Sequence, residues 1–458
     1  MRWRGPRHAI PAAGNDVTSS VRAIAEAAKC ASRKLSTYSA EQRNAAIHGA
    51  AVLIDRNRQV LFEANSKDLS AAAVMLASGR ISPATLERLR LTDKKIFEMT
   101  RSMLAVADLP DPVGRTLQRT ELDTGLVLEK ITCPLGVLAV IFEARPDAVT
   151  QISGLGLKSA NAVILKPGGE VQHTASQLVA LVRQALKEGG LPADAVNLVT
   201  GRESVEKLLG MSDLVDMVIP RGSKQLVEYV QANTRIPVLG HAEGICHIYI
   251  DKSADTDMAL AIVEDGKTDY PGACNAAETV LVHGAIAERF LPLLADRLHL
   301  RNVVLRGCDR TRAILARQPI EAVGDDDWHQ EYSDLVLAVR VLNSIADAIE
   351  HIHKYGSSHT ETIVTDDTAA AERFLHEVDA AGVFHNASTR FADGYRYGFG
   401  AEVGISTSKL HARGPVGVEG LTTYKYILRG RGQLARDYQG PDAKPFTHKQ
   451  LPSDSHHG

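Results

Sequence analysis

The chain has 458 residues, 44% of them hydrophobic and 23% charged, and its 52 Lys and Arg against 55 Asp and Glu give a formal net charge of −3. This balance is typical of a globular protein and excludes a disordered chain or a fibrous repeat. A net charge near zero argues against nucleic acid or an anionic membrane as partner. Apolar stretches such as Val137 to Phe142 are far shorter than the ~20 residues of a membrane span. We therefore expect about two or three domains, each with its own core.

The N-terminal segment and the cysteines bear on the cellular compartment. Residues 1–16 carry arginines without the apolar core of a secretory signal, so we expect a flexible start and a cytoplasmic protein. An odd set of scattered cysteines without a C-x-x-C pair indicates reduced thiols rather than a disulfide framework. They are Cys30, Cys133, Cys246, Cys274 and Cys308. No zinc-ligand spacing occurs among the Cys and His residues, and His456–His457 is read as tail, so no metal site is expected.

The first half of the chain reads as helices followed by an α/β series. Residues 17–106 have a helical period, and Leu126 to Lys130 and Val137 to Phe142 read as strands. Helices and strands then alternate over 147–239. The helices expected there are 147–159, 172–187, 205–209 and 223–232, and the strands are 162–165, 196–199, 217–219 and 237–239. This alternation predicts a parallel doubly wound sheet that binds its ligand at the carboxyl ends of the strands.

The second half repeats this architecture. Expected strands are 246–250, 279–282, 303–305, 335–341 and 362–365, and amphipathic helices include 285–297 and 345–353. These elements predict a second domain of the same class. After Phe391 glycine is frequent and the helical period ends, which indicates loops where binding groups tend to lie. Residues 439–458 are expected to be disordered.

Cys274 lies in the turn Tyr270–Thr279, directly before an apolar strand. A thiol near helix N-termini and cationic groups could attack a carbonyl or acyl carbon. A lone cysteine is more often a small core residue, so this segment gains weight only together with other motifs.

Lys166 follows a buried strand and precedes Pro167-Gly168-Gly169. Its ammonium would stand at the mouth of the sheet, within reach of ribose hydroxyls or a phosphate, although a lysine there is usually solvated. The run Gly154 to Ser159 is a weaker candidate. It reads as part of a helix that precedes a strand, so packing of small residues explains it better than a dinucleotide fingerprint.

The segment Ile219 to Ser223 marks a strand-to-helix junction. Free backbone N–H groups and the pair Gly222-Ser223 suit an anionic pyrophosphate, and Ser223 is also an expected N-cap. A plain helix cap is an equally good reading of this segment.

A cationic cluster follows in Ser406 to Pro415, where Lys409, His411 and Arg413 recur at every second position. On an extended segment they would point to one side and could clamp a phosphate or carboxylate. Solvated surface charge is the default reading of such a run. Arg145, after a buried strand, is a further candidate anion ligand.

The order of these motifs resembles the gamma-glutamyl phosphate reductases, the acyl-phosphate-reducing branch of the aldehyde dehydrogenase superfamily, from about Val17 to Tyr438. The most specific segments are Val140–Pro146, Ile219–Ser223, Gly244–Tyr249, Ala273–Thr279, Asn386–Phe391 and Lys409–Pro415. The resemblance implies an α/β protein with two doubly wound parallel-sheet domains and a β-hairpin oligomerisation flap. It places a nicotinamide-binding domain at 17–245 with the hairpin near 115–131, a catalytic domain at 246–391, and a substrate and oligomerisation segment at 392–438.

The resemblance also implies site residues. Cys274 matches the nucleophile, and Asn275 the residue that supports its turn. Lys166, Gly222, Ser223 and Glu331 match cofactor-binding positions, with Arg221 as a candidate ligand of a 2′-phosphate. Substrate and phosphate binding falls on Arg145, Asn386, Ser388, Arg390, Lys409, His411 and Arg413.

The implied reaction is NADPH-dependent reduction of L-glutamyl 5-phosphate to L-glutamate 5-semialdehyde through a cysteine thioester, in proline biosynthesis. Hydrolytic aldehyde dehydrogenases carry a general-base glutamate about thirty residues before the cysteine, and the matching stretch Pro237 to Gly240 is apolar. Glu243 is near enough in sequence to stay open as a base. The resemblance further implies a homo-oligomer and transient contact with a separate glutamate 5-kinase. An NAD-dependent aldehyde dehydrogenase and a catalytically silent assembly subunit remain the alternatives.

Overall fold

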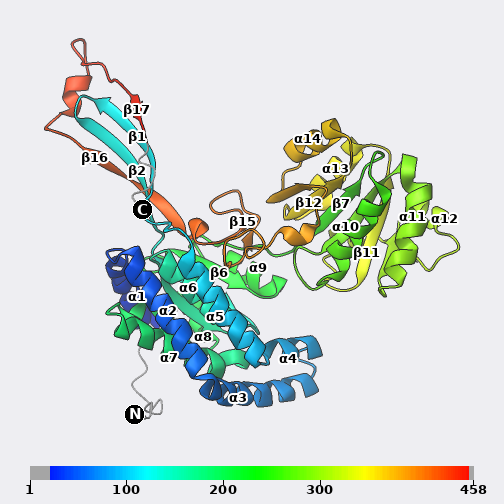
Figure 1. Ribbon diagram of the computed structural model, residues 1–458, viewed down its shortest axis with the longest axis horizontal. Coiled ribbons are helices and arrows are strands. Elements are labelled where there is room, and N and C mark those ends of the chain that lie inside the picture. Colours follow the sequence, from blue (N-terminus) through cyan, green and yellow to red (C-terminus); the bar gives the residue numbers. More distant parts are fainter. Residues whose placement is uncertain (1–20, 453–458) are drawn as a thin grey trace, which may run out of the picture.

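The computed structural model describes residues 21–452 and has two α/β bodies with an antiparallel arm (Figure 1). The expected fold class is confirmed, because two parallel sheets with helices on their faces account for most of the chain. The first body holds a sheet in the order β5-β4-β3-β6. Its strands are β3 (Val137–Phe142), β4 (Ala162–Pro167), β5 (Val196–Leu198) and β6 (Met217–Arg221).

Helices cover both faces of this first sheet. They are α1 (Val21–Leu35), α2 (Ala40–Arg56), α3 (Arg58–Ala77), α4 (Pro83–Leu89), α5 (Asp93–Asp108), α6 (Asp147–Lys158), α7 (Gln172–Glu188), α8 (Glu203–Leu209) and α9 (Lys224–Ala232). All of β3 is buried, with Leu138 in one hydrophobic cluster and Ala139 in the cluster on the opposite face. Burial on both faces explains why the strand is a continuous apolar run rather than an alternating one.

The glycines of α6 serve packing, as the sequence predicts. A Cβ on Gly156 would lie 2.5 Å from Cγ1 of Val163 in β4, so only glycine allows the helix to approach the strand this closely. The run Gly154 to Lys158 is therefore helical and structural rather than a nucleotide loop.

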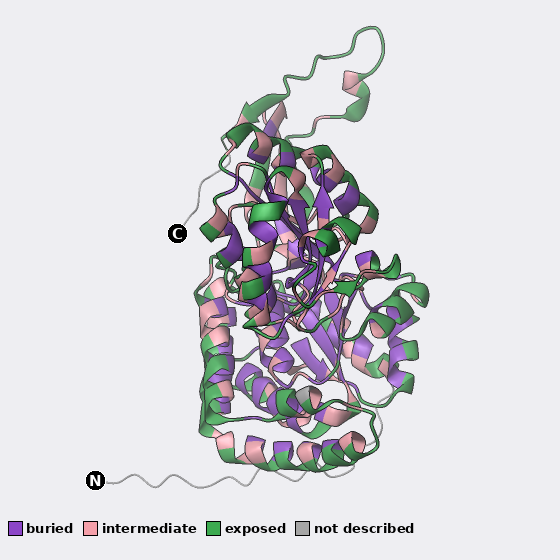
Figure 2. Ribbon diagram, turned by 90° about the vertical axis from the view of Figure 1, so that its right-hand side faces the viewer, coloured by how far each residue is buried: buried purple, intermediate pink, exposed green. Residues whose placement is uncertain are grey.

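The second body holds a parallel sheet of seven strands in the order β10-β9-β11-β8-β7-β12-β13. Its strands are β7 (Cys246–Ile250), β8 (Ala277–His283), β9 (Val304–Gly307), β10 (Glu321–Ala322), β11 (Val336–Leu342), β12 (Thr360–Val364) and β13 (Gly382–His385). Its helices are α10 (Thr256–Thr268), α11 (Gly284–His299), α12 (Asp309–Ile314), α13 (Ile345–Tyr355) and α14 (Thr368–Glu377). Buried residues concentrate in the sheets and on the inner faces of the helices (Figure 2).

The arm is a four-stranded antiparallel sheet in the order β16-β2-β1-β17. It combines the hairpin β1 (Thr116–Asp123) and β2 (Leu126–Pro134) with β16 (Thr422–Arg429) and β17 (Lys449–Leu451). Figure 1 shows it projecting from the first body. The disorder expected from residue 439 onward is wrong at β17, because Lys449–Leu451 pair with Glu121–Arg119 and gain ladder hydrogen bonds that the polar composition did not reveal.

The C-terminal segment returns to the first body. Its strands β14 (Ile405–Ser406) and β15 (Gly414–Pro415) pair with each other, and Val403 and Leu421 lie in the same core cluster as Leu138. The amide of Asn161 donates to the Leu421 carbonyl at 2.8 Å. The second body is thus inserted between two parts of the chain that build the first.

Two further features complete the fold. The strand expected at 237–239 is reduced to a single bridge between Val238 and Val218, because the chain leaves the sheet edge toward the second body. Within residues 21–452, none of the helices combines the length and apolarity that crossing a bilayer demands.

Candidate active site

Cys274 lies in the turn that leads into β8, and its side chain is half-buried. The loop before β7 packs directly against this turn: a Cβ on Gly244 would lie 2.0 Å from the Cys274 carbonyl oxygen. Only glycine fits there, because any other residue would collide with backbone atoms. The Cys246 thiol also donates to the Cys274 carbonyl at 3.3 Å. The position of Cys274 is therefore fixed by the loop before β7 and by the first residue of that strand.

Asn275 ties the same turn to the segment after β13. Its Nδ2 donates to the carbonyl of Ala392 at 2.8 Å and to that of Arg390 at 3.5 Å, and the side chain is buried. Its Oδ1 is buried without a hydrogen-bond partner. Because the Asn275 amide donates hydrogen bonds to these backbone carbonyls, it holds the cysteine turn in place.

Glu331 lies next to this turn, although 57 residues separate it from Cys274 in the sequence. Its Oε2 accepts a hydrogen bond from the Gly244 backbone N–H at 2.9 Å. The residue expected to bind the cofactor and the expected nucleophile thus meet at one glycine.

Glu243 forms an ion pair with a lysine. The Nζ of Lys224, on α9, lies 2.5 Å from Oε1 of Glu243, and the contact raises the pKa of Lys224. A general base must reach the water that it activates, and the ion pair directs this carboxylate toward Lys224 instead. This pairing argues against Glu243 as a general base.

Arg221 lies at the end of β6 and contacts the C-terminal segment. Its Nη1 donates to the Glu402 carbonyl at 3.2 Å, and its Cδ would lie 3.2 Å from a Cβ on Gly404. Burial lowers its pKa, the positive charge of Arg145 lowers it further, and the charge of Cys274 raises it. Arg221 and Arg145 therefore form a cationic pair near the cysteine.

Arg145 also lines a cavity of about 260 Å³. Its other walls are Arg88, Leu91, Lys95, Glu98, Met99, Ala144, Pro146, Asp147, Gln151 and Tyr270. Sequence reasoning missed the contribution of α4 and α5, because nothing in their helical pattern marks Arg88 or Lys95 as neighbours of the Cys274 turn.

The expected cofactor edge lies at the carboxyl ends of β4 and β6. Lys166 is half-buried there, and burial lowers its pKa. The Ser223 N–H at the start of α9 donates to Oε2 of Glu143 at 3.0 Å, while the Ser223 hydroxyl makes no capping bond. A Cβ on Gly222 would lie 2.4 Å from the same carboxylate oxygen. The backbone of this turn can thus bind an anionic oxygen, and here it binds a carboxylate oxygen of Glu143.

The cations of the C-terminal segment form a separate group. Lys409 and Arg413 both pair with Asp379, the latter at 2.9 Å, and His411 is exposed. In the described part of the chain, no ion pair or hydrogen bond joins this group to Arg145. The structure therefore divides the expected anion ligands into two sets.

The loop after β13 is braced by its own polar residues. The Asn386 amide bonds both backbone groups of Thr365, with Nδ2 3.0 Å from the carbonyl oxygen and Oδ1 2.9 Å from the nitrogen. The Ser388 hydroxyl accepts the Arg390 N–H at 3.3 Å, and the Arg390 guanidinium pairs with Asp269 at 3.1 Å. Ser388 and Arg390 are buried, so this loop presents a fixed backbone.

A buried ion pair beside the site was not assigned from the sequence. Lys267 Nζ and Glu278 Oε2 lie 2.7 Å apart and neither side chain is exposed. Burial raises the pKa of Glu278 to about 7, while the charge of Lys267 lowers it. Glu278 Oε1 also accepts the Ser333 N–H at 3.3 Å, which links β8 to the segment of Glu331. The signal was present, since Glu278 follows Cys274 within one motif.

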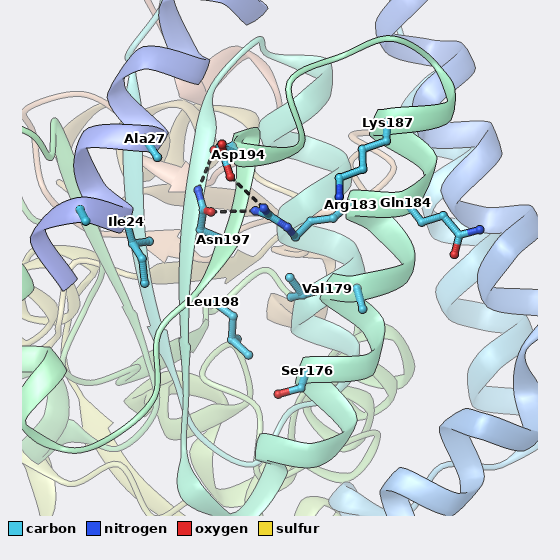
Figure 3. A pocket seen from close by; sticks show the side chains of 12 residues that line it. Ile24, Ala27, Ser176, Val179, Arg183, Gln184, Lys187, Asp194, Asn197 and Leu198 are labelled. Atoms are coloured by element: carbon cyan, nitrogen blue, oxygen red, sulfur yellow. Dashed lines mark hydrogen bonds and ion pairs between the residues drawn. The ribbon is translucent and has the colours of Figure 1, made fainter. Parts of the chain in front are cut away.

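Another cavity, with a volume of about 640 Å³, lies between α1 and α7 beside β5 (Figure 3). Arg183 in its wall bonds Asp194 and Asn197, each at 2.8 Å. None of the predicted site residues lines it.

Comparison with known proteins places the chain. Residues 9–304 match the model of the aldehyde dehydrogenase family. A gamma-glutamyl phosphate reductase of Natronomonas pharaonis is 49% identical over 95% of this chain and 99% of its own length, and that of a Cyanothece species is 51% identical over 93% and 97%. The crystal structure of the Thermotoga maritima enzyme superposes with a TM-score of 0.87 at 38% identity, covering 90% of this chain and 99% of that chain. The resemblance seen in the motifs is confirmed: this chain belongs to the gamma-glutamyl phosphate reductases, within the aldehyde dehydrogenase family.

Proposed function

We propose that the chain reduces L-glutamyl 5-phosphate to L-glutamate 5-semialdehyde and phosphate with NADPH, through a thioester on Cys274. The observation that carries this proposal is the packing of the Cys274 turn against Gly244, whose N–H is held by Glu331. This contact brings a thiol and a candidate ribose-binding carboxylate together beside β7 and β8 of the second sheet.

The first chemical step is acyl transfer. The Cys274 thiolate attacks the acyl carbon, a C–S bond forms, and the C–O bond to phosphate breaks with the electron pair leaving on phosphate. The backbone N–H of Cys274 stabilises the oxyanion. Arg221, whose charge interacts with that of Cys274, and its neighbour Arg145 are proposed to stabilise the departing phosphate. Lys409, His411 and Arg413 are proposed as further phosphate ligands, once an anion competes with Asp379.

The second step is reduction of the thioester. NADPH supplies a hydride when bound, and the C–S bond of the resulting thiohemiacetal then breaks to release the aldehyde. The chain contributes a cradle for the cofactor: the Ser223 N–H, the glycine at 222 and Lys166 at the end of β4. The Glu143 carboxylate, which bonds Ser223 at 3.0 Å, shows that this turn fits an anionic oxygen. Glu331 and Arg221 are proposed to contact the cofactor ribose and its 2′-phosphate.

Exclusion of hydrolysis is the third element of the proposal. Leu239, in the stretch that matches the general base of hydrolytic relatives, is buried, and Glu243 pairs with Lys224. Without a base to activate water, the thioester persists until hydride reaches it.

The loop after β13 is proposed to bind the α-carboxylate and amino groups of the substrate. Asn386, Ser388 and Arg390 hold its backbone rigid. We also propose that the arm joins subunits into a homo-oligomer, since Tyr424, Tyr426 and Leu428 on β16 are exposed. A separate glutamate 5-kinase would supply the labile substrate by transient contact.

The reverse reaction tests the function. Purified protein is given pyrroline-5-carboxylate, NADP⁺ and inorganic phosphate, and NADPH formation is followed by its absorbance. We expect turnover that depends on phosphate, prefers NADP⁺ to NAD⁺, and falls by about 10³-fold or more in Cys274→Ala.

The matched control is Cys308→Ser, which changes another half-buried thiol of the second body and should retain activity. Turnover that ignores phosphate would move the chain to the ordinary aldehyde dehydrogenases. Absence of turnover in a folded wild-type protein would instead favour an assembly subunit.

A further inference from the structure

Two histidines from different segments flank the Cys274 thiol. His241 lies in the loop between α9 and β7, and His359 directly precedes β12. One ring nitrogen of each and Sγ of Cys274 all lie within 4.8 Å of one another. The two imidazoles meet edge to face with centroids 4.8 Å apart. In residues 21–452 no hydrogen bond joins either ring to the thiol, so the three atoms surround a gap.

A hydrogen bond from one ring nitrogen sets the orientation of His241. Its Nδ1 lies 2.7 Å from the Ile405 carbonyl oxygen. A carbonyl only accepts, so Nδ1 carries the proton and Nε2 keeps its lone pair. An imidazole whose N–H is bound to a backbone carbonyl is the usual arrangement of a metal-ligating histidine.

His359 has one nitrogen in use and one free. Its Nδ1 lies 2.9 Å from Thr360 Oγ1 and 3.5 Å from Cys246 Sγ. Its side chain is completely buried, yet its Nε2 has no hydrogen-bond partner. A buried polar nitrogen without a partner costs free energy, and a ligand that binds it would remove that cost. This nitrogen is an observation independent of the cysteine, and it points to a ligand.

From these contacts we propose that Cys274, His241 and His359 bind a thiophilic divalent cation of the zinc type. Thiolates and imidazoles are donors that zinc binds in proteins, and a site with three protein ligands leaves the fourth tetrahedral position open. Tetrahedral coordination with Zn–N and Zn–S bonds of roughly 2.0 and 2.3 Å places ligand atoms about 3.3–3.6 Å apart. The present separations are at most 4.8 Å, so binding requires shifts of up to about 1 Å in the positions of these side chains.

Nearby charge sets the balance of this site. Arg221 opposes a cation, since its charge acts on both His241 and Cys274. The Cys274 thiolate offsets one of the two charges of the ion. Binding releases the thiol proton to solvent and forms one metal–sulfur and two metal–nitrogen bonds, with no change of oxidation state. Because His241, Cys274 and His359 are far apart in the sequence, they do not form a spacing typical of zinc ligands.

The bound ion would block the nucleophile reversibly. This consequence, unlike binding itself, rests on the proposed role of Cys274 in the reaction. A chelator would restore activity, because no covalent bond to carbon is made. The site would thus act as a metal-sensitive switch on the enzyme.

The test is a titration of metal-free full-length protein with Co²⁺, followed by absorption spectroscopy. We expect one equivalent to produce a thiolate-to-cobalt charge-transfer band with the intense ligand-field bands of four coordination, and Zn²⁺ to abolish both. Cys274→Ser should lose the charge-transfer band. His359→Gln and, separately, His241→Gln should weaken binding about tenfold or more. Cys308→Ser, which alters a thiol bonded to Thr311, is the control and should bind as wild type.

Thermal unfolding of each variant checks that it is folded. Bands that persist unchanged in both histidine variants, or a wild type that gives none, would overturn the site. In activity assays Zn²⁺ should inhibit the wild type, and His359→Gln should require about tenfold more. Binding without inhibition would uphold the site but overturn the proposed role of Cys274.

Discussion

The two α/β bodies bury charge in different ways. In the first body, buried charged side chains bind backbone groups at helix ends: Lys158 donates to the Ala107 carbonyl at 2.7 Å, and Arg43 donates to the Lys158 carbonyl. In the second body, buried ionisable side chains pair with each other, one pair between α10 and β8 and the other between β7 and β12. Lys267 meets Glu278 at 2.7 Å and His247 meets Glu361 at 2.9 Å, all four fully buried.

This difference separates bracing from tuning. Lys158 binds neutral groups, the Ala107 carbonyl and the Asn44 amide oxygen, while Arg43 adds an ion pair with the half-buried Asp111 to its backbone contact. In the second body both members of each pair are ionisable and fully buried, and Glu278 lies near the start of the strand that follows the Cys274 turn. The region around Cys274 therefore depends on matched buried partners, whereas the charges named in the first body bind mainly to peptide groups.

Breaking the buried ion pair should have the largest effect on stability. Lys267→Met removes the charge that lowers the pKa of Glu278 and leaves this carboxyl group buried without its partner. We expect a loss of about 3–5 kcal/mol in the free energy of unfolding at pH 8, measured by urea denaturation.

The double variant Lys267→Met/Glu278→Leu sharpens this prediction. Replacing both charges by apolar groups is often neutral or stabilising, so most of the loss should be recovered. A single variant as stable as the wild type would remove the contrast between the bodies at this pair.

A bracing carboxylate in the first body should matter somewhat less. Asp68 of α3 is 1% exposed and accepts the His173 and Thr174 backbone N–H groups at 3.0 and 2.8 Å, at the start of α7. Asp68→Ala should cost about 2–3 kcal/mol, because both N–H groups lose their acceptor and that of Thr174 is buried. Urea denaturation measures the loss, with exposed Asp213→Ala as a control expected to cost under about 1 kcal/mol. A cost that varied with pH between neutral and pH 8 would contradict a purely bracing role.

Acid should destabilise the second body by a smaller amount. His351 is buried and its Nδ1 accepts a hydrogen bond from Arg340 at 2.7 Å. Burial, with the charges of His247 and Arg340, lowers its pKa to about 2. Because the unfolded chain protonates this histidine near pH 6.5 and the folded protein does not, stability is full above pH 6.5 and lost as pH falls. The expected loss is about 1.4 kcal/mol per pH unit, or about 2 kcal/mol at pH 5.

The measurement follows the fluorescence of Trp328, whose ring lies 5.2 Å from that of His351, in a Trp3→Phe background. Urea denaturation at several pH values gives the slope of unfolding free energy against pH. Below pH 6.5, His351→Gln should reduce this slope by about 1.4 kcal/mol per pH unit, the contribution of one bound proton. Equal slopes in the two proteins would show that His351 is not the sensor.

Local pattern sufficed for much of the fold. The apolar run Val137–Phe142 and the following helix were predicted almost to the residue, because both depend on burial along one segment. The helix Thr256–Thr268 and the strand Gly382–His385 were missed. The strand is only half-buried, so its hydrophobic signal is weak.

The site could be predicted as motifs but not as contacts. Cys274, Glu331 and Ser223 follow from contiguous segments, whereas the bond from Gly244 to Glu331 and the pairing of Lys224 with Glu243 join residues that no short pattern relates. Packing between segments decides such contacts, and Gly244 shows why: its lack of a side chain matters only because Cys274 lies against it.

The insertion of the second body has a consequence for synthesis on the ribosome. Strands β7–β13 form one continuous stretch that can fold as a unit once it emerges. The core of the first body is completed later, because Val403 and Leu421 of that core are translated after the whole insert. Nascent chains therefore carry an unfinished apolar surface for the time it takes to make another domain. During that interval the first body is a natural client for chaperones, and a translational pause within the insert would prolong its exposure.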